Sequence, residues 1–196
     1  VTNASTNLTW SGASTNSSTA GIMKVGAGTL TLAGLSNYTG ITYINAGTVK
    51  LGNQKVNAKA PVTGTIHNIN SGPLGQGQAN GSSALTTSGT VVAAGATLDY
   101  NGYALGTVGY TYQRDFSYSS YYYSTYVYYE NISISGNGVG DAGAIINSSS
   151  KSIGTSYTNT NLNANATIGG TGNYKLLYYS GSATLTKKGN NTVTFN

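Results

Sequence analysis

The chain has 196 residues, enough for a single domain with a sizeable core. Charged residues make up only 7% of it, against roughly a quarter of a typical soluble domain. Gly, Ser, Thr, Asn and 17 Tyr take their place, and these residues favour turns and pleated sheets over helices. We therefore expect an ordered, all-β protein, since a disordered chain would be poorer in aromatic and β-branched residues.

The charge pattern and the missing cysteines exclude several classes of function. The nine Lys and Arg residues are spread along the chain, whereas a nucleic-acid partner requires them in clusters that contact phosphates. No apolar run approaches the roughly twenty residues of a membrane-spanning helix, so we do not expect a membrane-spanning protein. The chain has no Cys, which excludes disulfides and thiolate metal sites.

A repeated phrase near the two ends is the first organising feature of the chain. The segment Lys24–Leu32 reads KVGAGTLTL, and the segment Lys187–Phe195 reads KKGNNTVTF. In each copy a polar turn opens into a strand with apolar residues at alternate positions, such as Leu30 and Leu32. We expect the two ends to share one phase of this repeat.

Between the ends lies a series of short alternating strands separated by Gly and Asn turns. The phrase AGTVKLG at 46–52 returns as AGATLDYNG at 94–102. Short strands without helices allow a sandwich, a barrel or a solenoid. We favour the solenoid, because extra residues loop out of a stacked coil without disturbing its neighbours. The prediction is one β-solenoid domain over 1–196, with outgrowths at 53–83 and 110–129.

The second outgrowth contains the most unusual local sequence, YTYQRDFSYSSYYYSTYVYY from Tyr110 to Tyr129. Two interpretations stay open. One is a long β-hairpin, or an aromatic face packed against the flank of the solenoid. The other is a contact surface, either for a neighbouring subunit or for sugar rings that stack on aromatic side chains.

The segment Lys24–Asn53, KVGAGTLTLAGLSNYTGITYINAGTVKLGN, resembles the autotransporter-associated β-strand repeat of bacterial surface proteins. The shared motifs are a Gly-x-Gly-Thr-Leu-x-Leu strand from Gly26, an Asn-Tyr-Thr-Gly turn from Asn37, and a Thr-x-Ile-Asn-Ala-Gly-Thr-Val-x-Leu-Gly strand pair from Thr42. The resemblance implies a right-handed parallel β-helix in a passenger region that is exported to the cell surface. It also implies an extracellular location, and it brings no catalytic motif. Because the chain starts at Val1 without a Met or a basic and apolar leader, we expect a processed chain or an excised segment whose signal peptide lay upstream.

Residues that could carry enzyme chemistry are few and scattered. The carboxylates are Asp99, Asp115, Glu130 and Asp141. No two of them share a short motif, whereas a β-helix that cleaves polysaccharides needs clustered carboxylates. The single histidine, His67, lies in the first outgrowth without a second ligand nearby. We therefore expect no enzyme activity, no metal site and no cofactor.

A solenoid ends in two rungs whose strand edges lack a neighbour. The first rung of one copy could therefore continue the last rung of another and generate an open filament. We predict a structural subunit of a bacterial surface fibre or layer, with copies of itself as its main partner and surface glycans or other cells as further candidates. The predicted contact residues are Leu8, Trp10, Val193, Phe195, Tyr121, Tyr122, Tyr123, Tyr126 and Tyr128.

Two other functions stay open. The chain could be a segment of a long adhesin passenger that mediates adhesion to cells or surfaces. It could also be an ice-binding solenoid, which would display flat arrays of Thr-x-Thr pairs such as Thr29 with Thr31 and Thr192 with Thr194. Because these pairs do not recur at each predicted turn of the coil, ice binding is the least favoured function.

Overall fold

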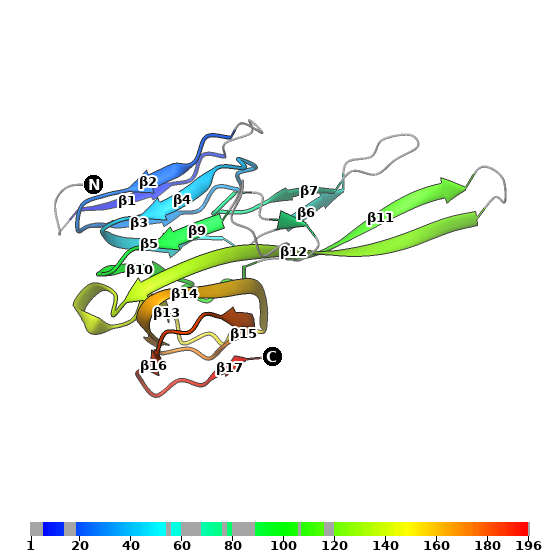
Figure 1. Ribbon diagram of the computed structural model, residues 1–196. Helices are drawn as coiled ribbons and strands as arrows, with labels where there is room; N and C mark the ends of the chain where they lie inside the picture. Colours follow the sequence, from blue (N-terminus) through cyan, green and yellow to red (C-terminus); the bar gives the residue numbers. More distant parts are fainter. Residues whose placement is uncertain are drawn as a thin grey trace.

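The computed structural model is an almost purely β protein (Figure 1). It describes residues 6–13, 19–53, 56–59, 68–75, 78–79, 89–105, 107–115 and 120–195. Apart from a short 3₁₀ turn at Val139–Asp141, the regular elements of these residues are strands.

Strands that are distant in the sequence pair in parallel to form two ladders of one 15-stranded sheet. Ladder A consists of β1 (Asn7–Trp10), β3 (Thr29–Leu32), β5 (Gly47–Leu51), β10 (Ala96–Asp99), β13 (Ile145–Asn147), the second half of β14 (Thr155–Gly170) and β16 (Leu185–Lys187). Ladder B consists of β2 (Ile22–Lys24), β4 (Ile41–Ile44), β9 (Gly89–Val92), the end of β12 (Ser120–Gly136), the first half of β14, β15 (Tyr174–Ser180) and β17 (Val193–Phe195). One ladder A strand followed by one ladder B strand makes a rung, and the rungs succeed one another from top to bottom of Figure 1. The fold is the parallel β-solenoid that the sequence predicts.

The interior of the coil is a stack of aliphatic side chains, with one level for each rung. The register of ladder A places a column of buried residues in line: Leu30, Val49, Leu98, Ile145 and Ile168. Alternate residues such as Thr29 and Thr31 face outward, as the period of two of a β-strand requires. Each fully buried Leu or Ile contributes roughly 1.5–3 kcal/mol, so the stack stabilises a chain that has few charges.

The repeated phrase at the two ends does not occupy equivalent positions in the coil. In the first copy the strand Thr29–Leu32 belongs to ladder A, whereas Val193–Phe195 belongs to ladder B. Likewise, Lys24 ends a strand of ladder B and Lys187 ends a strand of ladder A. The expectation that both ends share one phase is therefore wrong by half a rung. The similarity of the two phrases reflects the local turn, which can form at either corner of a rung.

Both long insertions leave the solenoid at the same corner, between a ladder A strand and the next ladder B strand. The first separates β5 from β9, and its described strands are β6 (Val56–Lys59), β7 (Asn68–Ser71) and β8 (Gln78–Ala79). The second is a long antiparallel hairpin of β11 (Thr107–Asp115) and the first part of β12, which projects to the right in Figure 1. The two insertions meet where β8 pairs with β12.

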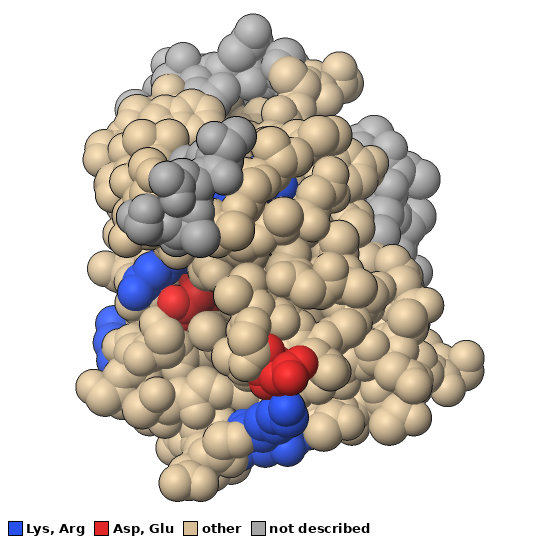
Figure 2. All heavy atoms as spheres, turned by 90° about the vertical axis from the view of Figure 1, so that its left-hand side faces the viewer, with Lys and Arg blue, Asp and Glu red and all other residues tan. Residues whose placement is uncertain are grey.

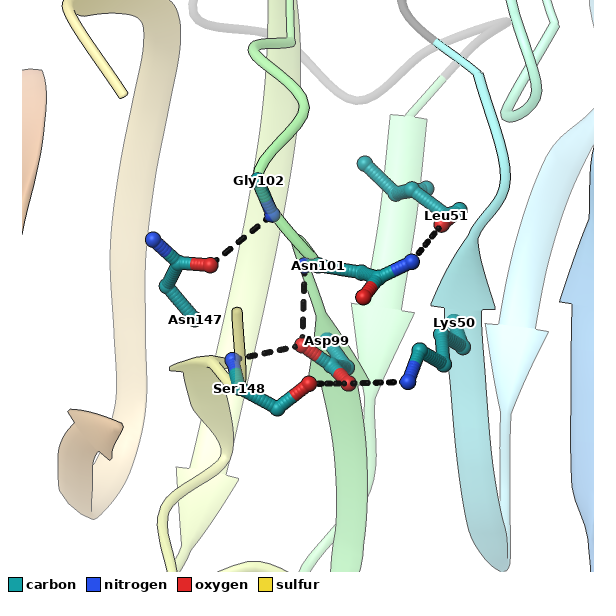
Figure 3. A network of polar contacts seen from close by, with 7 residues as sticks. All are labelled: Lys50, Leu51, Asp99, Asn101, Gly102, Asn147 and Ser148. Atoms are coloured by element: carbon teal, nitrogen blue, oxygen red, sulfur yellow. Dashed lines mark hydrogen bonds and ion pairs between the residues drawn. The ribbon is translucent and has the colours of Figure 1, made fainter. Parts of the chain in front are cut away.

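A polar network ties successive rungs together at this corner (Figure 3). The carboxylate of Asp99 accepts a hydrogen bond from the backbone N–H of Asn101 at 2.9 Å. It also accepts two bonds from Ser148 on the next rung, from the N–H at 3.0 Å and from the hydroxyl at 2.6 Å. On the preceding rung, Lys50 Nζ lies 3.8 Å from the carboxylate, and the carbonyl of Leu51 accepts a bond from the Asn101 amide. Asp99 thus joins three rungs.

Asparagine side chains make similar bridges at the same corner of other rungs. Asn53 donates its amide to the carbonyl of Ala33 at 3.3 Å, and Asn191 donates to the carbonyl of Gly172 at 3.0 Å. These bonds satisfy turn carbonyls that the stacking of rungs removes from water. Asn therefore links neighbouring rungs here, in addition to forming turns.

We expect Asp99→Ala to lower the free energy of unfolding by about 3 kcal/mol, because it removes the buried carboxylate that accepts the hydrogen bonds of Asn101 and Ser148. Lys50→Ala removes only a half-exposed ion pair and should lower it by less than about 1 kcal/mol. Urea denaturation followed by circular dichroism measures both values. Equal losses for the two variants would show that the ion pair, and not the bonds to Ser148 and Asn101, stabilises this corner.

Candidate functional site

The structure assigns the acidic side chains to separate places. Asp99 is held in the corner network, and Asp141 is exposed on the 3₁₀ turn. Glu130 is buried within the coil, where its carboxylate accepts a hydrogen bond from the Thr90 hydroxyl at 2.9 Å. Within the described part of the chain, no three His, Asp or Glu side chains form a group that could hold a metal ion. The side chain of Asp115 and the whole of His67 lie outside the described residues.

Charged side chains of both signs lie beside one another. On the face shown in Figure 2, blue and red side chains are neighbours and no continuous basic surface is formed. Lys50 pairs with Asp99, and Lys188 Nζ donates to the backbone carbonyl of Asp141 at 3.3 Å. None of the described elements is a helix with the length and apolar character that crossing a membrane requires.

The upper end of the solenoid is formed by β1 and β2, which within the described residues are each paired on one side only. The register places Leu8 opposite Leu30 and Trp10 opposite Leu32, so both side chains continue the interior column. Leu30 and Leu32 are buried, whereas Leu8 is 52% exposed and Trp10 is 39% exposed. The difference arises because no described rung covers β1.

The lower end is formed by β16 and β17, which pair with β14 and β15 respectively. Val193 lies opposite the buried Tyr174, and Phe195 lies opposite the buried Leu176. The ring of Phe195 is 41% exposed and packs edge-on against Tyr179, with ring centroids 5.7 Å apart. This end also combines an open strand edge with apolar side chains that continue the interior.

The structure thus brings the predicted contact residues of the end strands to the two ends of one interior stack. The half-rung offset of the repeated phrase does not affect this arrangement, since each end rung has one strand of each ladder. The contact of Tyr179 with Phe195 was not predicted from the sequence. A register shift between Ser156 and Asn159 lets Tyr178 face outward and turns Tyr179 toward the interior, and the run Tyr-Tyr-Ser carries no signal of such a shift.

The tyrosine run forms the hairpin of β11 and β12. Its last residue, Tyr129, packs against the flank of the solenoid, with ring centroids 5.6 Å from Tyr178 and 6.4 Å from Tyr157. Desolvation and the neighbouring Tyr178 raise the pKa of the Tyr129 phenol. The predicted contact side chains of this run lie outside the described residues, so their role stays a prediction: Tyr121, Tyr122, Tyr123, Tyr126 and Tyr128.

The outer face of ladder A gives no support to ice binding. Thr29 lies in register with Thr48 on the next rung. In the adjacent outward column, however, Thr31 is followed by Lys50 and Asp99. A flat array of paired Thr residues therefore does not form across these rungs.

The comparison with protein families supports the resemblance found in the sequence. Residues 23–51 match the family model of the passenger-associated-transport-repeat. The matched stretch runs from β2 to β5 and so contains the turns that carry the chain from the first rung into the third. No curated protein and no solved structure matches the chain. The chain is thus a parallel β-solenoid in which residues 23–51 are similar to a passenger repeat, and this similarity indicates a secreted or cell-surface protein.

We expect amide hydrogen exchange to be graded along the coil. Rungs contact only their neighbours, so the end strands β1 and β17 open most easily and the middle strands β10 and β13 least easily. Mass spectrometry of peptides from the monomer should show protection at least about tenfold higher in the middle strands. Uniform protection would contradict the view that the end strands are held by one neighbour each.

Proposed function

We propose that this protein is a structural, non-catalytic, extracellular β-solenoid whose copies join end to end by β-strand addition. The observation that carries the proposal is the pair of end rungs, each of which, among the residues that the structure describes, has an unpaired strand edge and exposed apolar side chains in line with the core. The passenger repeat supports the extracellular location.

The directions of the strands favour this mode of assembly. All pairings within the two ladders are parallel, so a second copy in the same orientation would place β1 below β16 and β2 below β17. The backbone of each added strand would satisfy the N–H and C=O groups of the open edge. Leu8 and Trp10 would then meet the lower end of the interior, and their burial from water would stabilise the junction. Because the two contacting surfaces differ, the assembly is head-to-tail and grows as a filament if it does not close.

The family match favours a second candidate, a segment of a long adhesin passenger. In that case the open edges of β1, β2, β16 and β17 would be continued by further rungs of the same chain. Concentration dependence separates the two functions. The 196-residue chain would form filaments on concentration if it assembles with copies of itself. It would remain monomeric if its edges require rungs supplied by the same chain.

We expect Val193→Pro to prevent filament formation while the monomer keeps its melting temperature. The N–H of Tyr174 donates to the carbonyl of Thr192, so the alternation along the strand directs the N–H of Val193 away from β15 and toward the open edge. Proline lacks this donor and is tolerated at a strand edge. Sedimentation velocity should show a threshold concentration for assembly at least about tenfold higher than in the wild type.

Val193→Ala is the matched control, because it keeps the N–H and removes only part of the side chain. It should raise the threshold concentration less than Val193→Pro does. Negative-stain micrographs that show Val193→Pro filaments of normal length at the wild-type threshold would overturn the proposed strand addition at this end.

A further inference from the structure

Two lysines occupy the same local structure at opposite ends of the coil. Lys24 is the last residue of β2 and Lys187 is the last residue of β16. Each is followed two residues later by a glycine with positive φ, Gly26 at 77° and Gly189 at 79°. In both places the lysine Nζ donates to the carbonyl of that glycine at 2.5 Å. The two turns are therefore built in the same way.

The two lysines differ in what lies on the next rung. Lys24 is opposite Ile44, and its Nζ also donates to the carbonyl of Ala46 at 2.9 Å, two residues beyond Ile44. The side chain of Lys24 is only 2% exposed, and this burial lowers the pKa of its ammonium group. Lys187 has the bond within its own turn, but no other described rung covers it, and its side chain is exposed.

Lys187 lies at the lower end of the solenoid, where the proposed junction forms. Lys187 lies opposite the buried Ile168, so its stem continues the interior column of ladder A into the open lower end. A rung added at this end would cover the ammonium group as the second rung covers Lys24. A covered ammonium group is tolerated only where acceptors satisfy its three donors.

We propose that Lys187 fixes the register of the end-to-end junction by donating to a backbone carbonyl of the added copy. Ala46 lies in the turn two residues after the last residue of β4. The matching position in a second copy lies two residues after the last residue of β1, so the acceptor is in the turn Ser11–Ala13. A strand added in a shifted register would bury the charge without this acceptor, and such a junction is disfavoured. This inference rests on the proposed head-to-tail assembly and assigns the residue that sets its register.

The test compares Lys187→Met with Lys188→Met in the 196-residue chain. Methionine keeps an apolar stem of similar length and removes the donors, whereas Lys188 bonds only to the carbonyl of Asp141 among the described residues. Lys187→Met should raise the threshold concentration for assembly about tenfold by sedimentation velocity, with an unchanged melting temperature of the monomer. Lys188→Met should assemble as the wild type does.

Equal thresholds for all three proteins would overturn the role of Lys187 and leave the proposed assembly standing. A wild type that stays monomeric at every concentration would overturn both.

Lysine labelling of the wild type provides a second measurement that does not depend on a variant. Reductive methylation followed by mass spectrometry should modify Lys187 readily in monomers and at least about tenfold more slowly in filaments, because a buried, bonded amine is less accessible. Lys24 should be protected in both states and serves as the internal reference. Lys187 that is modified equally fast in filaments would show that the junction leaves it free, which overturns the proposal.

Discussion

In a parallel solenoid the hydrogen-bonding groups of each strand point along the axis of the coil, toward the rungs above and below. Every strand of the interior must therefore meet two neighbours in register, and this requirement aligns columns such as Leu30, Val49 and Leu98. The same requirement is unmet on one side of β1 and β2 and on one side of β16 and β17 in the described chain. Core stability and the proposed assembly thus have one physical origin.

The corner between ladders A and B combines strong links between rungs with tolerance of insertions. Asp99 and the asparagine bridges connect the backbone of one rung to that of the next. The ladders on both sides already fix the register, so a long excursion between them changes only the loop. The two insertions occur on consecutive rungs, which explains why β8 can pair with β12.

The alternation of apolar residues in segments such as Thr29–Leu32 was enough to predict short strands, because each strand needs only one buried face. The solenoid was favoured over a sandwich or a barrel by the phrase AGTVKLG at 46–52, which returns as AGATLDYNG at 94–102. The phase of the C-terminal copy was not predictable, since its turn has the same local geometry at either corner. The burial of Lys24 and Glu130 was equally hidden. Their compensating partners, Ala46 and Thr90, are distant in the sequence and become neighbours only when rungs stack. The end strands were identifiable as candidate contacts because their apolar alternation lies near the two ends of the sequence. The orientation of Tyr179 depends on the register shift between Ser156 and Asn159, which the sequence does not signal.

Both insertions project from a single corner, so they lie on the same side of the solenoid. Copies stacked along one axis would present their tyrosine-rich hairpins as a periodic row. Rungs are spaced by about 4.8 Å, so the interval between neighbouring hairpins would be set by how many rungs one copy contributes, and by nothing in the hairpin itself. The hairpins could then change in sequence from protein to protein without altering the support that spaces them.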